Sequence, residues 1–113
     1  MSALDEANRL HYQVGDHARA LACYRSVLAG DPAYATAQRM IGHNIYGRAW
    51  GRWAEGIPYL ETARRAAPND PKVLEDLGRA YLAVGRLDEG RALLERAGSP
   101  VAERALRHLD AGG

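Results

Sequence analysis

The chain has 113 residues, the length of one domain, and a formal net charge of +1 from 15 basic and 14 acidic residues. This balance lacks the basic excess of a nucleic-acid-binding protein, and no window of the sequence is apolar enough to span a membrane. Cys23 is the only cysteine, so no intramolecular disulfide can form. The first ten residues include two acids and do not resemble a secretory signal, so we expect a cytoplasmic protein.

The first third of the chain predicts two helices joined by a tight turn. Apolar residues recur at helical spacing on both sides of Gly15-Asp16, a pair typical of turns. Asp31-Pro32 marks the end of this unit. Alanine, leucine and arginine are abundant and β-branched residues are sparse, which favours helix along the whole chain.

The same unit recurs twice. Each turn glycine is followed by a small residue and, four residues later, by a large one, in the sets Gly15-Ala20-Tyr24, Gly51-Gly56-Leu60 and Gly85-Gly90-Leu94. The small residue lets two helices approach closely, and the large one fills the same helix face. Asp70 can cap the first helix of the third unit, and Pro71 suits its first position. We expect units at about 1–34, 35–70 and 71–98, and a final amphipathic helix at about 100–110.

These units resemble the tetratricopeptide repeat family, whose repeat is a helix–turn–helix of 34 residues. The third copy carries the resemblance best, through Leu74, Leu77, Gly78, Tyr81, Gly90 and Leu94. The first helices of the other two copies depart from the pattern. The resemblance implies an all-α, right-handed superhelix of three repeats and a C-terminal capping helix. The final helix can also be interpreted as the first half of a truncated fourth repeat.

The second repeat carries two extra residues. Its first helix is offset from that of the first repeat by 34 residues, from Asn8 to Gly42. Its turn is offset by 36 residues, from Gly15 to Gly51. The two residues therefore lie between Gly42 and Gly51, in a first helix that is longer or in a turn that is wider.

Two glycines and a proline bear on this corner. Gly47 and Gly51 favour the wider turn. Pro58 would cost about 3 kcal/mol inside a helix but is tolerated in a first turn. We therefore expect the second helix of this repeat to start late, near Ala54.

The resemblance also implies that the first helices line a concave groove where a partner binds. Matched positions give three rows across these helices: Asp5, Arg39 and Glu75; Arg9, His43 and Arg79; Tyr12, Tyr46 and Leu82. The first row alternates in sign and can neutralise itself between neighbouring helices. The second row holds no acid, although its arginines could pair with Glu6 or Asp76. Cations beside tyrosine rings suit an acidic peptide that also carries an apolar side chain.

One subgroup of the family clamps the C-terminal carboxylate of chaperones with lysine, asparagine and arginine side chains of the first helices. Only Lys72 matches that pattern here. The other positions hold Asp5, Arg9, Met40 and Asp76. We therefore reject that ligand and expect a different acidic segment.

Both tryptophans flank the turn of the second repeat. Trp53 follows the turn glycine by two residues, where the family buries a large side chain, so we expect it in the core. Trp50 is equivalent to Val14 and Val84 and is either partly buried or an anchor for a partner. The partner-binding candidates are Arg9, Tyr12, Arg39, His43, Tyr46, Trp50 and Arg79.

No cluster of residues predicts catalysis, a cofactor or a metal site. No two histidines form an i, i+4 pair, and the chain has neither a Cys-x2-Cys motif nor a glycine-rich phosphate loop. Cys23 reads as a small core residue, and we expect His11 to pack in the core as well. We therefore expect a protein that is not an enzyme.

The favoured function is a protein–protein interaction module that holds an acidic peptide or extended protein segment in its groove. A scaffold that self-assembles through its end faces is an alternative. An accessory domain of a larger enzyme system, cut from a longer chain, is another. Neither nucleic acid nor a membrane is an expected partner.

Overall fold

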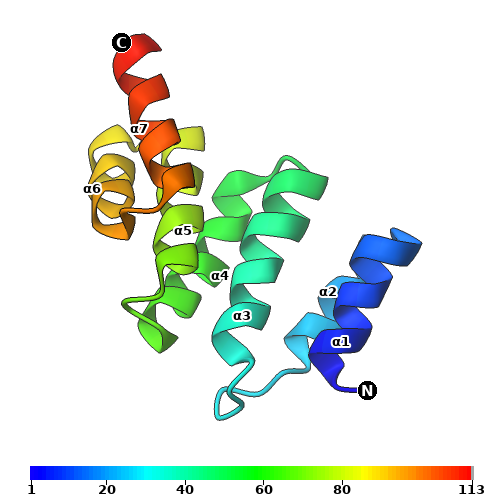
Figure 1. Ribbon diagram of the computed structural model, residues 1–113. Coiled ribbons are helices and arrows are strands. Elements are labelled where there is room, and N and C mark those ends of the chain that lie inside the picture. Colours follow the sequence, from blue (N-terminus) through cyan, green and yellow to red (C-terminus); the bar gives the residue numbers. More distant parts are fainter. Residues whose placement is uncertain (113) are drawn as a thin grey trace.

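The computed structural model describes residues 1–112, which are mostly helical and contain no strand (Figure 1). The helices are α1 (Ala3–Asn8) with its continuation η1 (Arg9–Val14), α2 (His17–Arg25), α3 (Tyr34–Arg39) with its continuation η2 (Met40–Ala49), α4 (Trp53–Ala66), α5 (Pro71–Ala83), α6 (Leu87–Ala97) and α7 (Pro100–Gly112). The two η segments have the wider π-helical hydrogen-bonding pattern. The predicted all-α fold is confirmed.

Local sequence signals set the ends of several helices. The Ser2 hydroxyl accepts from the Asp5 amide, and the Asp5 carboxylate accepts from the Ser2 amide in return. The carboxylate of Asp70 caps α5 as predicted, because it accepts from the amide of Lys72. Because one side-chain oxygen satisfies an otherwise free amide at each start, these helices begin where the sequence places a Ser or Asp.

The three turns share one backbone geometry. Gly15, Gly51 and Gly85 all have positive φ, at 78°, 66° and 84°. L-residues with a side chain rarely adopt this conformation, which explains why a glycine recurs at each turn. The equivalence of the three turns that the spacing predicted is therefore confirmed.

The extra residues of the second repeat lengthen its first helix, so the expected wider turn is wrong. The α3–η2 helix combines six and ten residues, whereas α1–η1 combines six and six. Gly47 lies inside η2, where the Trp53 ring packs against its backbone and leaves no room for a side chain. A Cβ atom added to Gly47 would lie within 2.6 Å of three ring atoms of Trp53.

The predicted start of α4 near Ala54 is met to within one residue, but the predicted place of Pro58 in the first turn is wrong. The helix begins at Trp53, two residues after its turn glycine, as α2 and α6 do after theirs. Pro58 therefore lies within α4 rather than in its first turn. The proline removes a hydrogen bond to the carbonyl of Ala54, and this position is exposed, so water can replace the lost donor.

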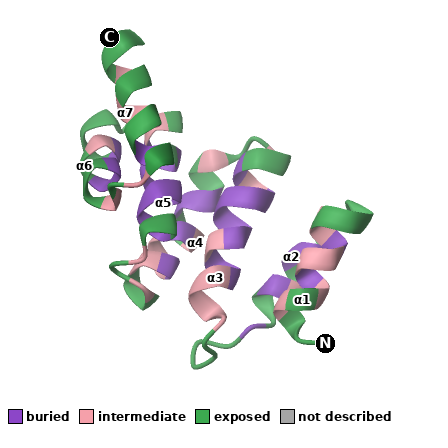
Figure 2. Ribbon diagram, in the orientation of Figure 1, coloured by how far each residue is buried: buried purple, intermediate pink, exposed green. Residues whose placement is uncertain are grey.

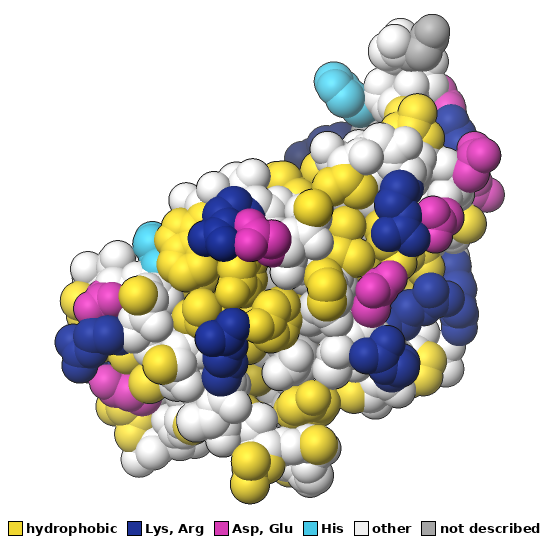
Figure 3. Space-filling model, turned by 180° about the vertical axis from the view of Figure 1, so that it is seen from behind, with side chains coloured by type: hydrophobic (Ala, Val, Ile, Leu, Met, Phe, Trp, Pro, Cys, Tyr) yellow, Lys and Arg dark blue, Asp and Glu magenta, His cyan; other side chains and the backbone are white. Residues whose placement is uncertain are grey.

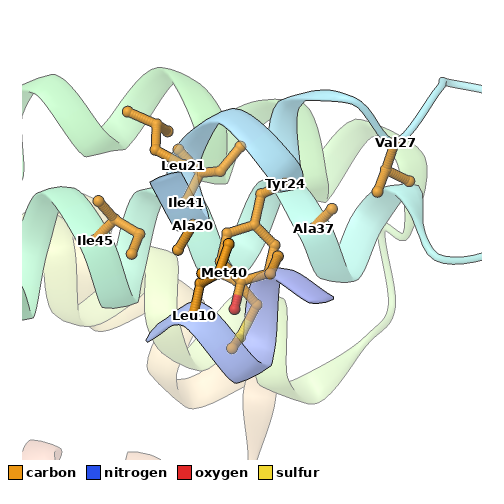
Figure 4. Close-up of a cluster of buried hydrophobic side chains, with 10 residues drawn as sticks. Leu10, Ala20, Leu21, Tyr24, Val27, Ala37, Met40, Ile41 and Ile45 are labelled. Atoms are coloured by element: carbon orange, nitrogen blue, oxygen red, sulfur yellow. The ribbon is translucent and has the colours of Figure 1, made fainter. Parts of the chain in front are cut away.

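Two clusters of buried side chains form the hydrophobic core. Buried residues lie along each of the three helix pairs (Figure 2). The first cluster joins α1–η1, α2 and α3–η2 around the fully buried Tyr24 and Ile41 (Figure 4). The second joins α4, α5 and α6 around Leu60 and Leu77. Cys23 packs against the first cluster and Trp53 against the second, both partly buried, as the sequence predicted.

The helix pairs follow one another along an elongated molecule of 43 × 26 × 22 Å, with α1 at one end and α7 at the other (Figure 1). Within the second pair the backbones come close, because a Cβ on Gly42 would lie 2.6 Å from the carbonyl oxygen of Gly56. The right-handed superhelical course and the repeat boundaries near residues 34, 70 and 98 stay predictions.

Candidate binding groove

A groove of about 460 Å³ crosses α1–η1, α3–η2, α5 and the start of α7. Its basic side chains are Arg39, Arg48, Lys72 and Arg79, and its acidic side chains are Glu75 and Asp76. Neutral polar groups and one ring complete it, chiefly Asn8, Tyr12, Thr36, His43 and Asn44. The groove therefore combines four cations, two anions and several hydrogen-bonding groups on the first helices of successive pairs.

Buried acids join the helices at the floor of this groove. Asp76 on α5 is buried and accepts a hydrogen bond from the Arg39 guanidinium on α3 at 3.0 Å. Glu75 is buried beside it and accepts from the Ser99 hydroxyl, just before α7, at 2.7 Å. Each acid already binds a side chain of a neighbouring element. Both acids therefore hold the groove helices together and leave little negative charge for a ligand to meet.

A third polar contact joins the first two helix pairs. The buried Asn44 side chain on η2 donates to the hydroxyl of Tyr12 on η1 at 2.8 Å. Tyr12 itself is 64% exposed, so its ring faces the open groove while its hydroxyl is held. Together with Arg39–Asp76 and Ser99–Glu75, this contact gives every neighbouring pair of groove helices one polar connection.

His43 lies on the groove floor and is only 6% exposed. Its Nδ1 atom has no hydrogen-bond partner in residues 1–112 and lies 3.8 Å from a carboxylate oxygen of Asp76. Burial lowers the pKa of His43, Asp76 opposes this effect, and the nearby cations Arg79, Arg48 and Arg39 lower the pKa further. The imidazole is therefore neutral at pH 7, and the lining residues carry a net charge of +2.

Two groove cations remain available to a ligand. Arg48 at the end of η2 and Arg79 on α5 are both exposed. Neither forms an ion pair with any acid of residues 1–112, unlike Arg39, which is held by Asp76. An exposed guanidinium without an acidic partner can form a bidentate hydrogen-bonded pair with a carboxylate.

The predicted row of Arg9, His43 and Arg79 does not form. His43 and Arg79 do line the groove. Arg9 turns along its own helix and pairs with Glu6 at 2.6 Å, the partner considered as an alternative from the sequence. Arg9 is absent from the groove lining, because this local pair holds its guanidinium on α1–η1.

The first predicted row is wrong in its partners. Asp5 is engaged with Ser2 at the start of α1. Arg39 pairs with Asp76, one residue beyond Glu75, the acid of its own row. The charge of Arg39 is neutralised by an acid of a neighbouring helix as expected, but that acid is Asp76 rather than Glu75.

Tyr46 does not face the groove, which corrects the third row. Gly42 faces α4 closely, and Tyr46 lies four residues later on the same side of the helix. A Cβ on Gly56 of α4 would lie 3.1 Å from the Cβ of Tyr46. Tyr12, the matched residue of the first repeat, does line the groove.

Tyr46 and Trp50 belong instead to an aromatic cluster on the side of α2 and α4. The ring of Tyr46 stacks on Tyr59 at 5.4 Å and meets Trp50 edge-on at 5.2 Å. Arg25 donates to the hydroxyls of both tyrosines, and Arg52 lies over the rings of Tyr46 and Trp50. Figure 3, seen from behind, shows hydrophobic side chains gathered near the middle of this face with basic side chains across them. Trp50 is half-buried here and does not line the groove.

Sequence reasoning missed several groove residues. Arg48 and Asn44 lie outside the three rows that the matched positions define, although both line the groove from η2. Asn8 and Thr36 gave no distinguishing signal. Lys72 was noted only as a match to another ligand type, although it lines the groove.

A histidine pair closes the turn of the first repeat. The Nδ1 atoms of His11 and His17 lie 3.0 Å apart, so one imidazole donates to the other. Burial lowers the pKa of His11, and the neighbouring His17 and Arg48 lower it further. His11 is half-buried, so the expectation that it lies in the core is met only in part. In residues 1–112 no group of three or more His, Cys, Asp or Glu side chains could hold a metal ion.

Stacked helix–turn–helix pairs with a groove along their first helices define a helical-repeat fold. Models of the tetratricopeptide repeat family match residues 7–42 and 48–110, and the second match alone covers more than half of the chain. The chain therefore belongs to the tetratricopeptide repeat family. A search of curated proteins finds no match.

Tetratricopeptide repeats generally mediate protein–protein interactions and are typically non-catalytic. No helix within residues 1–112 combines the length and the apolar character that crossing a membrane requires.

Proposed function

We propose that this chain is a cytoplasmic interaction module that binds an acidic peptide or extended protein segment in its groove. The observation that carries the proposal is the pair of exposed guanidinium groups of Arg48 and Arg79, at two points of a groove whose acids are already engaged. Carboxylates of a bound segment would meet both arginines, while the held Tyr12 ring offers a flat apolar surface.

Calorimetric titration with a synthetic acidic peptide tests this proposal. Arg48→Glu combined with Arg79→Glu should weaken binding at least tenfold, because it replaces two attractive charges with two repulsive ones. Arg19→Glu combined with Arg65→Glu makes the same change of net charge on exposed positions of α2 and α4 and should change affinity less than twofold. Equal losses in the two double variants would show that net charge, and not the groove, governs binding.

Salt dependence provides a second measurement. Contacts between exposed charges are screened, so the dissociation constant should rise as ionic strength increases from 0.05 to 0.5 M, values chosen to shorten the screening length severalfold. In the Arg48/Arg79 double variant the dependence should reverse, because salt then screens two repulsive charges. An affinity that does not change with salt would argue for an uncharged ligand.

Self-assembly is a second candidate function, supported by one feature. Leu28, after the end of α2, is 75% exposed and lines a hollow with Leu4 and Val27 at the α1 end of the molecule. An exposed apolar side chain in a hollow favours a protein contact. Light scattering with the wild-type chain and Leu28→Asn tests it, since a concentration-dependent mass that the substitution abolishes is expected.

A further inference from the structure

A second hollow, which we call the α7 cleft, opens between α5, the start of α6 and α7. It has a volume of about 580 Å³, and its apolar lining is Leu82, Leu87, Val101, Ala105 and Leu109. This volume lies within the range of about 300–1,000 Å³ that is usual for ligand pockets. The last turns of α7 project beyond the other helices at this end (Figure 1).

Contacts near both ends of α7 hold the cleft open. At the start, Ala102 is fully buried and Ser99 donates to Glu75. Near the other end, Asp110 accepts from the guanidinium of Arg91 on α6 at 2.7 Å. Since α7 is attached to α5 at its start and to α6 near its end, the cleft exists without a ligand, and little ordering is needed on binding.

The apolar side chains of the cleft are accessible. Leu87 is 49% exposed and Val101 is 36% exposed, both unusually open for branched aliphatic residues. Covering them with an apolar group would remove their surface from water, which favours binding. These side chains therefore provide the driving force for a ligand in this cleft.

The charged groups of the cleft are all cations. They are Arg79 and Arg104, with the His108 ring beside them, and no acidic residue lines the cleft. None of the three forms an ion pair with an acid of residues 1–112. An apolar floor with a basic rim is complementary to an apolar side chain that has carboxylates beside it.

The cleft adjoins the groove. Arg79 and Val101 line both hollows, so a segment that crosses Arg79 passes from one into the other. We propose that the α7 cleft receives an aliphatic side chain of the same acidic segment that occupies the groove. This inference rests on the proposed function and adds that the ligand is acidic along its length and apolar at one end.

Four capped synthetic peptides test the inference. Each contains four glutamates, with a leucine or a serine placed at either the amino or the carboxyl end, so that both chain directions are sampled. Calorimetry with the wild-type chain should show one leucine peptide binding about tenfold more tightly than its serine counterpart, the gain expected for burying most of a leucine side chain. Leu87→Asn combined with Leu109→Asn, two positions that line the cleft but not the groove, should remove this preference and leave the affinity for the serine peptides unchanged.

Controls separate the possible failures. Leu28→Asn, an exposed leucine at the other end of the molecule, should keep the preference for leucine. Equal affinity of the wild-type chain for leucine and serine peptides would overturn the cleft inference and leave the groove proposal standing. Absence of binding by all four peptides would overturn both. If the double cleft variant changes the oligomeric mass in light scattering but not peptide affinity, a second copy occupies the cleft, and the inference is wrong.

Discussion

Substitution of Gly47 should reveal how closely the second repeat is packed at its long first helix. An alanine Cβ at this position would come within 2.6 Å of three ring atoms of Trp53, so the ring or the backbone must move. Such overpacking costs about 1–3 kcal/mol or more, whereas alanine gains about 1 kcal/mol over glycine in a helix interior. We expect Gly47→Ala to lower the free energy of unfolding by about 2 kcal/mol, which combines a cost near the upper end of the overpacking range with this gain.

The effect of Gly47→Ala on the free energy of unfolding should change sign when the Trp53 ring is removed. In a Trp53→Ala background the added methyl group meets no indole, so Gly47→Ala should stabilise by up to about 1 kcal/mol. The coupling between the two substitutions should then be about 3 kcal/mol, well above the error of a double-mutant cycle. Urea unfolding followed by circular dichroism measures all four proteins.

Gly30→Ala is the matched control, since an added Cβ there has no neighbour within 4 Å. Its effect should stay within about 0.5 kcal/mol. Equal destabilisation by Gly47→Ala in the presence and absence of the Trp53 ring would refute the packing argument. The cause would then lie in the π-helical backbone itself.

Three further predictions concern the groove and the aromatic cluster. Asp76→Asn should lower the free energy of unfolding by about 1–3 kcal/mol, measured by urea titration, because Arg39 loses its buried charged partner. Burial lowers the pKa values of His11 and His43, so the folded chain binds fewer protons than the unfolded chain near pH 6. Stability should therefore be full above about pH 6.5 and fall below it, and glutamine at both histidines should flatten melting temperatures between about pH 7 and 5. Trp50→Ala should destabilise by about 1–3 kcal/mol yet change acidic-peptide affinity less than twofold, and a large loss of affinity in calorimetry would return Trp50 to the binding site.

The spacing of small residues predicted the arrangement of the helices well. Three turn glycines at matched positions, each followed by a small and a large residue, correspond in the structure to three turns with the same positive φ. These signals are local, since a positive φ or a close backbone approach demands glycine wherever it occurs. They did not reveal how two extra residues would be accommodated, because π-helical turns leave no distinctive composition.

The candidate site was predicted less well, for a geometric reason. The match to Tyr12 placed Tyr46 in the groove. Tyr46 lies four residues after Gly42, which faces α4, and residues four apart share one side of a helix. Arg9 does not line the groove as predicted, because its guanidinium pairs with Glu6 on its own helix. Tyr12, Arg39, His43 and Arg79 do lie along the groove, and whether they bind a partner stays a prediction.

The boundary between the two hydrophobic clusters has a consequence for how the molecule responds to a ligand. One cluster is shared by α1–η1, α2 and α3–η2, and the other by α4, α5 and α6. The two halves are joined at this boundary, because the backbones of η2 and α4 come close at Gly42 and Gly56. The groove crosses the boundary, from Tyr12 on η1 to Arg79 on α5 and Val101 on α7. A segment bound along its length would contact both halves, so occupancy of the groove should raise the free energy of unfolding of the whole chain.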